Sequence, residues 1–524
     1  MMKSLLPEKY HQSIYIFALA LLVIGMPLSK FLMSLAQIIL VGNWVLEGNI
    51  KNKLISFWKN KPAVILSSLL LLHFIGLIYT SDLNYAFKDI RIKGPLLILP
   101  LILSTSKPLS KELFEWVLKA FVASIILGTI ISMLILNDII PRQVVDVRNV
   151  SIFISHIRFA LLICVAIFVS AYFFFQSPNS TKKYVWVAII VWLIAFLIIM
   201  ESLTGLATLA IAIFIIGVYF VLKLKKQFYK YAFFTLIAAG IASTYIFINS
   251  EINKINNHVE KINLNELINY TSKGNLYVHN LTSNLYENGN LIWIYICEPE
   301  LEQSWNARST IPYNSKDLKG NELHFTLIRF LSSKGLRKDA DAVNSLTVEE
   351  IKAIERGAPN VNYMNVSSLR GRLYSTLWEI KEYKKDGDAN GHSLAQRFEY
   401  WKASIGIIKE NLLFGVGTGD IQQSFDEYYV KTNSILKKEL RLRSHNQYLS
   451  ITVAFGIIGL LWFLITLFYP MLKQKKMFDF LYISFFIIAL ISFFTEDTLE
   501  TQAGVTFYAF FNSIFLFLQP QKED

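Results

Sequence analysis

Repeated apolar runs of about 20 residues are the feature that most restricts how this chain can fold. A helix of about that length crosses a hydrocarbon core ~30 Å thick, so each run is a candidate transmembrane helix. The chain is 53% hydrophobic and only 17% charged. A soluble domain carries about 25% charged residues, so this composition also favours a membrane protein.

We expect about twelve membrane helices, separated into two groups by one long polar segment. The first helix follows Lys3 and Lys9, and it continues into further apolar runs without a small-residue cleavage site. We therefore interpret it as a retained helix rather than a signal peptide. Residues 85–93, before the short fourth helix, are expected either to span or to lie along the membrane surface. The predicted helices cover residues 11–28, 31–46, 63–79, 94–105, 113–136, 151–175, 184–200, 203–222, 231–249, 446–469, 478–494 and 503–519.

Lysine side chains gather in every second connector between these helices. Connectors rich in lysine face the cytoplasm, so both termini are expected there and the long polar segment is expected to face outward. This placement accounts for the net charge of +12 without nucleic acid. The basic connectors contain Lys51, Lys53, Lys59 and Lys61, then Lys107 and Lys111, then Lys182 and Lys183, then Lys223, Lys225, Lys226 and Lys230, and finally Lys473, Lys475 and Lys476.

The expected fold is an all-α polytopic membrane protein with one large, mostly helical periplasmic loop domain. The polar segment of about 195 residues is long enough for such a domain. Short strands are expected within Asn263–Tyr295, and helices from Leu323 onward. The predicted parts are an N-terminal membrane region of about nine helices (1–249), the loop domain (250–445) and a C-terminal membrane region of about three helices (446–524).

Two capping boxes are predicted in the loop domain. Thr347 and Glu350 begin a helix over 348–356, and Ser393 and Gln396 begin a longer helix. In the longer helix, apolar residues repeat at alternating spacings of four and three. One face can therefore pack on neighbouring helices or on the membrane surface. This apolar stripe consists of Leu394, Phe398, Trp401, Ile405, Ile408 and Leu412.

Two arginines are candidates for binding an anionic group near the outer face. Arg158 is expected two turns into the helix that begins at residue 151, and its guanidinium can hold phosphate oxygens in a fork. It can instead reach the lipid headgroups as a snorkelling side chain. Arg397 lies beside the apolar stripe, and its alternative role is that of a solvated arginine paired with Glu399 or Glu410.

A second basic group comes directly before the tenth predicted helix. Arg441 and Arg443 lie on the outer side, where topology disfavours positive charge, so they bind either a lipid pyrophosphate or lipid headgroups. His445, with Asn446 beside it, is expected to begin the helix, where the positive end of the dipole favours neutral imidazole. Neutral imidazole can act as a general base towards a hydroxyl, and the alternative is a structural histidine.

Other polar clusters are assigned less active roles. The glycines at 415, 417 and 419 are not followed by Gly-Lys-Ser/Thr, so we expect a structural turn rather than a phosphate loop. The acidic group Glu496, Asp497 and Glu500 can bind a divalent ion or cap the last helix, but we expect pairing with the arginines. No CxxC or HExxH pattern is present, and we expect neither a metal nor a cofactor.

These residues, in this order, resemble the signature of the bacterial O-antigen ligase and polymerase superfamily. Arg158 with Leu162 matches an R-x-x-x-L motif, and His445-Asn446 is followed after nine residues by Gly456-x-x-Gly459. The stretch 396–420 is similar to the family segment that precedes the histidine, and the resemblance covers most of residues 60–515. Many members have a Ser-Arg pair where this chain has Glu201-Ser202, so an arginine role at that place is in doubt. The outer segment is also longer than in many ligases.

The resemblance implies a metal-independent glycosyltransferase of the cell envelope. A glycan would pass from an undecaprenyl-pyrophosphate carrier to a hydroxyl of lipid A core or a related acceptor, at the periplasmic face of the inner membrane. The arginines would hold the pyrophosphate, and the histidine would orient or deprotonate the acceptor hydroxyl. The implied catalytic residues are His445, Arg158 and Arg397, and the implied substrate-binding residues are Arg443, Arg441 and Asn446.

Three other functions remain open at this point. An O-antigen polymerase and a protein O-oligosaccharyltransferase differ from a ligase in the acceptor, whose choice depends on the shape of the outer loop. A polysaccharide exporter or flippase would not be an enzyme. Transporters often contain internal repeats and charges at mid-membrane depth. In this chain we find no convincing repeat, and the candidate site residues gather at the outer edge of the membrane.

Overall fold

The computed structural model of the protein describes residues 7–142, 146–256, 267–283, 285–364 and 369–520. The chain forms two compact units. Unit 1 comprises Met1–Arg142, Val150–Phe220 and Asp388–Asp524, and unit 2 comprises Gln143–Asn149 and Val221–Gly387. The predicted boundaries at 249 and 445 concern membrane topology, which this division does not address.

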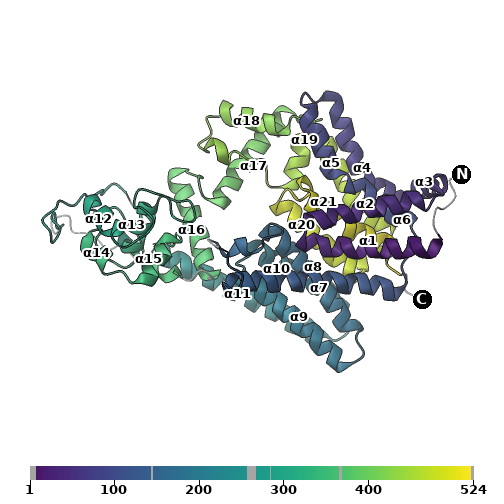
Figure 1. The fold of residues 1–524 in the computed structure, drawn as a ribbon, viewed down its shortest axis with the longest axis horizontal. Coiled ribbons are helices and arrows are strands. Elements are labelled where there is room, and N and C mark those ends of the chain that lie inside the picture. The colour runs from purple at the N-terminus through teal and green to yellow at the C-terminus, as the bar shows by residue number, and fades with distance from the viewer. Residues whose placement is uncertain (1–6, 143–145, 257–266, 284, 365–368, 521–524) are drawn as a thin grey trace. The chain divides into compact units, whose positions relative to one another are not determined.

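Unit 1 is a bundle of helices, and most of them are long and apolar (Figure 1). A helix lies at each of the twelve positions predicted for the chain, eleven of them in unit 1 and the twelfth, α11, in unit 2. The helices of unit 1 are α1 (Glu8–Leu28), α2 (Lys30–Leu46), α3 (Ile50–Lys59), α4 (Lys61–Ile75), α5 (Leu83–Lys93), α6 (Pro95–Thr105), α7 (Lys111–Leu136), α8 (His156–Gln176), α9 (Ser180–Ile199), α10 (Leu203–Lys223), α17 (Ser393–Glu410), α18 (Ile421–Lys431), α19 (Gln447–Lys473), α20 (Phe480–Thr495) and α21 (Gln502–Ser513).

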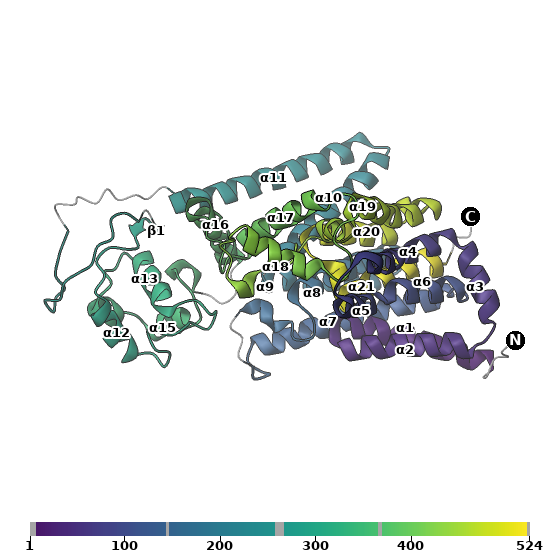
Figure 2. The same ribbon diagram turned by 90° about the horizontal axis from the view of Figure 1, so that it is seen from above.

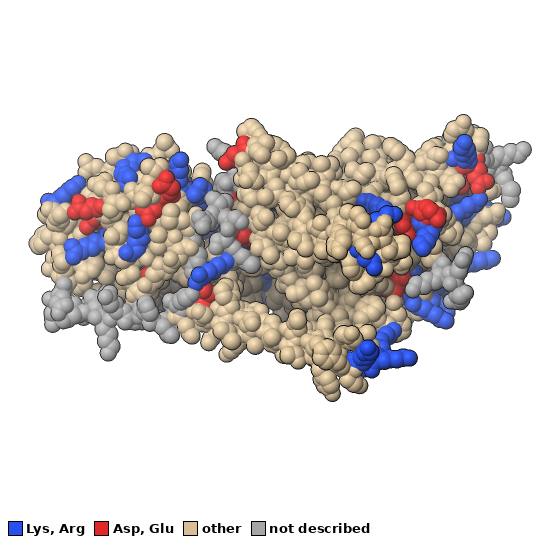
Figure 3. All heavy atoms as spheres, turned by 90° about the horizontal axis from the view of Figure 1, so that it is seen from below, with Lys and Arg blue, Asp and Glu red and all other residues tan. Residues whose placement is uncertain are grey.

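The apolar helices are those of a multi-pass membrane protein. Among the described residues, eight helices are long and apolar enough to cross a membrane. The count is nine if α2 and α3, which meet at a bend of 112°, form one broken span. Helices α20 and α21 are shorter, so a total of twelve spans remains a prediction. On the face drawn in Figure 3, uncharged side chains cover a broad central area, as contact with lipid requires.

The N-terminal helices pack against the C-terminal ones, although about 300 residues or more separate them in the sequence. Helix α4 lies along α19, and α6 lies along α21, so that purple and yellow ribbons adjoin in Figures 1 and 2. Hydrogen bonds also join the two ends of the chain. Trp462 Nε1 of α19 donates to Ser68 Oγ of α4 at 3.1 Å, and Gln37 Nε2 of α2 donates to Thr506 Oγ1 of α21 at 3.0 Å. This packing brings the first hundred residues next to the segment that carries His445.

Helix α19 is broken at Gly456, whose φ of 64° and ψ of −166° are not helical. The turn after α17 fills the break, because Val416 N–H and Gly417 N–H donate to the carbonyls of Val453 and Ala454, both at 2.9 Å. Ile457 N–H in turn donates to Leu412 O at 2.8 Å. The predicted structural role of the glycine-rich turn is therefore confirmed. A broken helix at membrane depth needs such partners for the backbone groups that it frees.

Unit 2 has its own hydrophobic core, which includes Trp305, Leu327 and Phe330. The predicted short strands are present as a two-stranded antiparallel pair. The predicted capping box of Thr347 and Glu350 is also confirmed. The elements of unit 2 are α11 (Gln227–Asn256), β1 (Tyr286–Glu287), β2 (Asn290–Leu291), α12 (Glu298–Asn306), α13 (Leu323–Ser333), α14 (Ala340–Asn344), α15 (Val348–Glu355) and α16 (Leu369–Asp386).

Some predicted helix starts are wrong. The helix expected from residue 151 begins at His156, because Ser155 caps it by accepting a bond from Arg158 N–H. The second capping box does not form, since the N-cap of α17 is His392 and no side chain caps this end. The predicted start at 446 is one residue early, because Asn446 is the N-cap of α19 and lies outside the helix.

Candidate functional site

A short acidic turn between α20 and α21 connects most of the predicted site residues of unit 1. It contains Glu496, Asp497 and Glu500, each of which is at most 9% exposed. A buried carboxylate is costly unless cations or hydrogen-bond donors compensate it. Each of the three has different partners, and these partners come from parts of the chain that are far apart in sequence.

Glu496 lies between the predicted arginine and the predicted histidine. Its Oε1 accepts a bond from Arg397 Nη2 at 2.7 Å, and its Oε2 lies 3.6 Å from His445 Nδ1. Burial opposes ionisation of Glu496, yet His445 and the charges of Arg397 and Arg158 hold its pKa below the ordinary value. The carboxylate is therefore ionised at neutral pH, and it faces both side chains. One of the two interpretations of the sequence paired Arg397 with Glu399 or Glu410. The structure pairs it with Glu496 instead.

His445 has a backbone conformation that is unusual for its residue type. Its φ is 46°, in the left-handed region, so the chain turns sharply between Arg443 and the start of α19. Its N–H donates to Asp497 Oδ2 at 3.1 Å, which holds this turn against the acidic loop. The imidazole stacks on the ring of Tyr400 from α17, with ring centroids 5.5 Å apart. His445 is thus fixed on its backbone and on one ring face, while its Nδ1 faces Glu496 without a hydrogen bond among the described residues.

Asp497 accepts hydrogen bonds from residues on both sides of His445. Its Oδ1 accepts bonds from Ser450 Oγ at 2.9 Å and from Ser444 Oγ at 3.4 Å. Burial raises the pKa of Asp497 above the ordinary value, although the charges of His445 and Arg443 act in the opposite direction. The bonds that Asp497 accepts come from both sides of His445 in the sequence. Asp497 is therefore a positioning group for the turn.

Glu500 anchors the other end of the acidic turn in a buried ion cluster. Lys93 Nζ, which is fully buried, lies 2.8 Å from Glu500 Oε2 and 2.6 Å from Asp89 Oδ1. Arg443 Nη1 lies 3.3 Å from the same Glu500 oxygen and donates to Tyr85 Oη at 2.9 Å. Burial opposes the charge of Lys93, yet its two carboxylate neighbours raise its pKa above the ordinary value. The predicted pairing of the acidic group with the arginines is confirmed at Glu496 and at Glu500.

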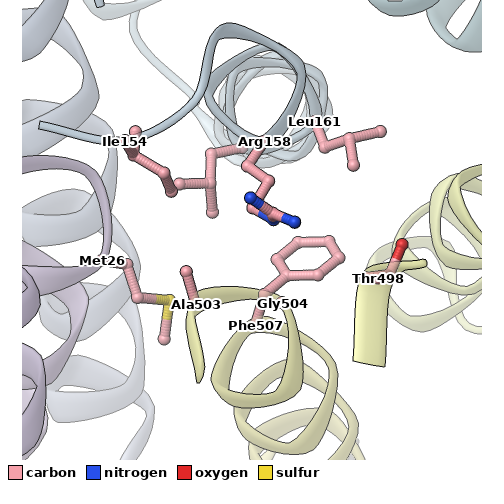
Figure 4. A pocket seen from close by; sticks show the side chains of 9 residues that line it. Met26, Ile154, Arg158, Leu161, Thr498, Ala503, Gly504 and Phe507 are labelled. Carbon is pink, nitrogen blue, oxygen red and sulfur yellow. The ribbon is translucent and has the colours of Figure 1, made fainter. Parts of the chain in front are cut away.

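Arg158 approaches the acidic turn from α8. It is the third residue of the helix, in the first turn rather than two turns in, as the sequence had suggested. Its side chain extends toward Phe507 of α21 across a small pocket that Met26, Ile154 and Thr498 also line (Figure 4). Its charge acts on Glu496. Its Nε is buried and has no hydrogen-bond partner among the described residues, so it can still donate to an anion.

The structure brings Arg397 and His445 together at Glu496, and the charge of Arg158 acts on the same carboxylate. Arg443 also reaches the acidic turn, but there its guanidinium serves Glu500 and Tyr85. Arg441 turns away to its own loop, where its Nε donates to Leu436 O at 3.0 Å.

Asn446 is the N-cap of α19, and its side chain also donates to Phe494 O at 3.0 Å. These contacts give Asn446 a structural role in the described residues. The histidine itself precedes the helix by two residues, so the expectation that His445 begins α19 is wrong. Dipole stabilisation of neutral imidazole in the first turn therefore does not apply to it.

Sequence reasoning did not identify Lys93, Asp89 or Tyr400. The signal for the first two was a Lys four residues after an Asp, directly before an apolar run, in the segment 85–93. Such a pair is usually solvated, and its burial follows from packing against the acidic turn some 400 residues later. Tyr400 lies next to the predicted stripe on α17 but on its buried side.

Comparison with known proteins gives a match in this part of the chain. Residues 360–464 match the family model described as O-Antigen ligase, and this range contains both Arg397 and His445. No curated protein matches the chain. Through the matched residues, the resemblance of the chain to the O-antigen ligase superfamily is confirmed.

Proposed function

We propose that the protein is a glycosyltransferase that ligates a glycan from an undecaprenyl-pyrophosphate carrier to a hydroxyl of lipid A core or a related acceptor. The observation that carries this proposal is that Arg397 and His445 meet at the ionised Glu496, on which the charge of Arg158 also acts, in a chain whose residues 360–464 match the family model O-Antigen ligase. The reaction would take place at the periplasmic face of a bacterial inner membrane. The alternation of basic connectors along the sequence supports this orientation.

The leaving group of the reaction is a pyrophosphate, so the site must stabilise negative charge as the glycosidic bond breaks. Arg158 and Arg397 have buried Nε atoms without a hydrogen-bond partner among the described residues. Such donors are positioned before the reaction and need little reorganisation when charge develops. We assign both guanidinium groups to the two phosphate groups of the donor. Arg443 would contribute through its charge, and its Nη1 is already bonded to Tyr85 and Glu500.

The acceptor hydroxyl must lose its proton as it attacks the anomeric carbon. Glu496 Oε2 lies 3.6 Å from His445 Nδ1, which is beyond hydrogen-bond distance, and the charge of this carboxylate favours the proton on Nδ1 and the lone pair on Nε2. Nε2 can then take the hydroxyl proton, and the ionised Glu496 stabilises the imidazolium that forms. The new bond joins the acceptor oxygen to the anomeric carbon, and the carrier leaves as polyprenyl pyrophosphate. A single displacement of this kind inverts the anomeric configuration.

Two experiments test the proposed function. Replacement of His445 by Ala should abolish long-chain lipopolysaccharide in cells while the protein level stays unchanged, and a normal ladder on a gel would refute the proposal. Purified protein in detergent should transfer the glycan from the carrier to lipid A core, with equal rates before and after treatment with a chelator. An exporter needs a sealed bilayer and would form no product in detergent. Analysis of the product identifies the acceptor and the anomeric configuration.

A further inference from the structure

Helix α17 has an exposed apolar groove that begins beside the proposed pyrophosphate site. Arg397, Trp401 and Ile405 follow one another at spacings of four, so they form one row along the helix. Phe398 is 39% exposed and Ile405 is 48% exposed, although both are apolar. Together with Trp401 and Tyr428 of α18 they line a groove with about 740 Å³ of empty space, which we call the α17 groove. An arginine therefore precedes a row of partly exposed apolar side chains on the same helix.

The contacts of α17 place this groove beside membrane helices. In the middle of α17, Trp401 packs on Phe494 at the end of α20, with ring centroids 5.7 Å apart. Just beyond the end of α17, Leu412 O accepts a bond from Ile457 N–H, ten residues into α19. Ten helical residues rise about 15 Å, roughly half of a hydrocarbon core. The helix that lines the groove thus packs beside the first half of an apolar spanning helix, and this favours an apolar chain over water as the occupant of the groove.

The charge pattern restricts the occupant further. Lys402 and Lys409 line the groove, and Arg397 lies about one helical turn before Trp401. Lysine stems can cover an apolar chain while their ammonium groups reach outward. The fitting ligand is an anionic group bonded directly to a long apolar chain. In lipid A core, by contrast, sugars separate the acyl chains from the reacting hydroxyl, so that acceptor does not meet this requirement.

We propose that the α17 groove binds the isoprenoid chain of the lipid-pyrophosphate donor, with Trp401 and Ile405 as its principal contacts. The proposal rests on the proposed function in one respect, namely that Arg397 holds the pyrophosphate. The apolar pocket beside Arg158 is a competing place for the chain. A bilayer phospholipid is a competing occupant of the groove itself. The experiments below separate these possibilities.

The first experiment uses the wild-type protein in nanodiscs and needs no glycan transfer. The probe is a photoactivatable polyprenyl pyrophosphate without a sugar, and labelled peptides are mapped by mass spectrometry. We expect labels on residues 397–409 that unlabelled polyprenyl pyrophosphate displaces. Labels confined to the pocket residues around Met26 and Phe507 would overturn the proposal. A photoactivatable phosphatidylglycerol is the second probe. The proposal would also be overturned if this lipid labelled α17 as strongly as the polyprenyl probe and unlabelled polyprenyl pyrophosphate did not displace it.

The second experiment compares Trp401→Ala with Trp58→Ala, a truncation of the same side chain at a position of α3 that is 64% exposed. Transfer is measured with a full-length donor and with a donor whose isoprenoid chain is short. For Trp401→Ala we expect KM for the full-length donor to rise about tenfold, which corresponds to about 1.4 kcal/mol. The KM for the short donor and the kcat for both donors should stay unchanged, and Trp58→Ala should behave as wild type.

Equal effects of Trp401→Ala on both donors, or none on either, would contradict the proposal. If the wild-type protein transfers glycan from neither donor, the proposed function fails. The labelling experiment still decides whether the groove binds an isoprenoid chain in that case, because it does not depend on turnover.

Discussion

Substitution of Glu496 by Gln removes one charge from the centre of the site and keeps the size of the side chain. At 3.6 Å from His445 Nδ1, the carboxylate acts directly on the imidazolium that the reaction forms. Two unit charges at that separation interact by about 1 kcal/mol in water and by about 5 kcal/mol at an effective dielectric constant of ~20. The His445 side chain is 33% exposed, so an intermediate value of about 2–3 kcal/mol is expected. This value corresponds to a kcat that is roughly 30- to 150-fold lower.

The assay is transfer by purified protein at saturating donor and acceptor, so that kcat is measured separately from KM. Glu410→Gln is the matched control, because Glu410 is 50% exposed and its partner Lys431 is 65% exposed. Loss of such a surface pair costs at most about 1 kcal/mol of stability. We therefore expect the kcat of Glu410→Gln to equal that of wild type. If Glu496→Gln kept kcat within about threefold of the control, stabilisation of the imidazolium by Glu496 would be refuted.

Three further predictions concern stability and are measured on purified protein by thermal unfolding. Gly456→Ala should lower the free energy of unfolding by about 1–3 kcal/mol, because φ at Gly456 is positive and the new Cβ would lie 2.2 Å from a backbone oxygen. The control is Gly42→Ala, where a new Cβ meets nothing within 4 Å, and it should lower the free energy of unfolding far less. Lys93→Met should cost roughly 3–5 kcal/mol because two buried carboxylates lose their partner. Lys119→Met, at a side chain 48% exposed, should cost less than about 1 kcal/mol. The lowered pKa of Glu496 stabilises the fold fully above its ordinary value of 4.5, so this contribution should be lost only as the pH falls below that value. Equal melting temperatures within a matched pair, or loss of the Glu496 contribution already at neutral pH, would contradict the corresponding prediction.

The helices could be predicted from the sequence because hydropathy is a local property. An apolar run of sufficient length forms a helix in a membrane whatever it packs against, since its backbone groups must bond to each other. The exact starts were harder to predict, because a single side chain decides them. Ser155 caps α8, so this helix begins five residues after the expected start. No side chain caps α17, despite the pattern at Ser393.

The candidate site could be predicted in part. Arg158, Arg397 and His445 were recognisable from motif spacing; the structure brings Arg397 and His445 to Glu496, and the charge of Arg158 acts on the same carboxylate. Their arrangement could not be predicted, because it depends on contacts between residues that are far apart in sequence. The bond between Lys93 and Glu500 spans 407 positions, and no local pattern signals such a pair.

The acidic turn explains why so many irregular backbone features occur in one place. A helix presents its side chains at fixed intervals, so one helix cannot direct three residues at a single carboxylate. Here Glu496 receives Arg397 from the second turn of a helix and His445 from a left-handed residue outside another, and the charge of Arg158 acts on it from the first turn of a third. The left-handed conformation at His445 persists because Asp497 accepts its N–H, and the acidic turn is itself held by the buried Lys93. The strain at the histidine is therefore compensated by an ion cluster that does not touch it, and the position of the imidazole depends on charges from the first hundred residues of the chain.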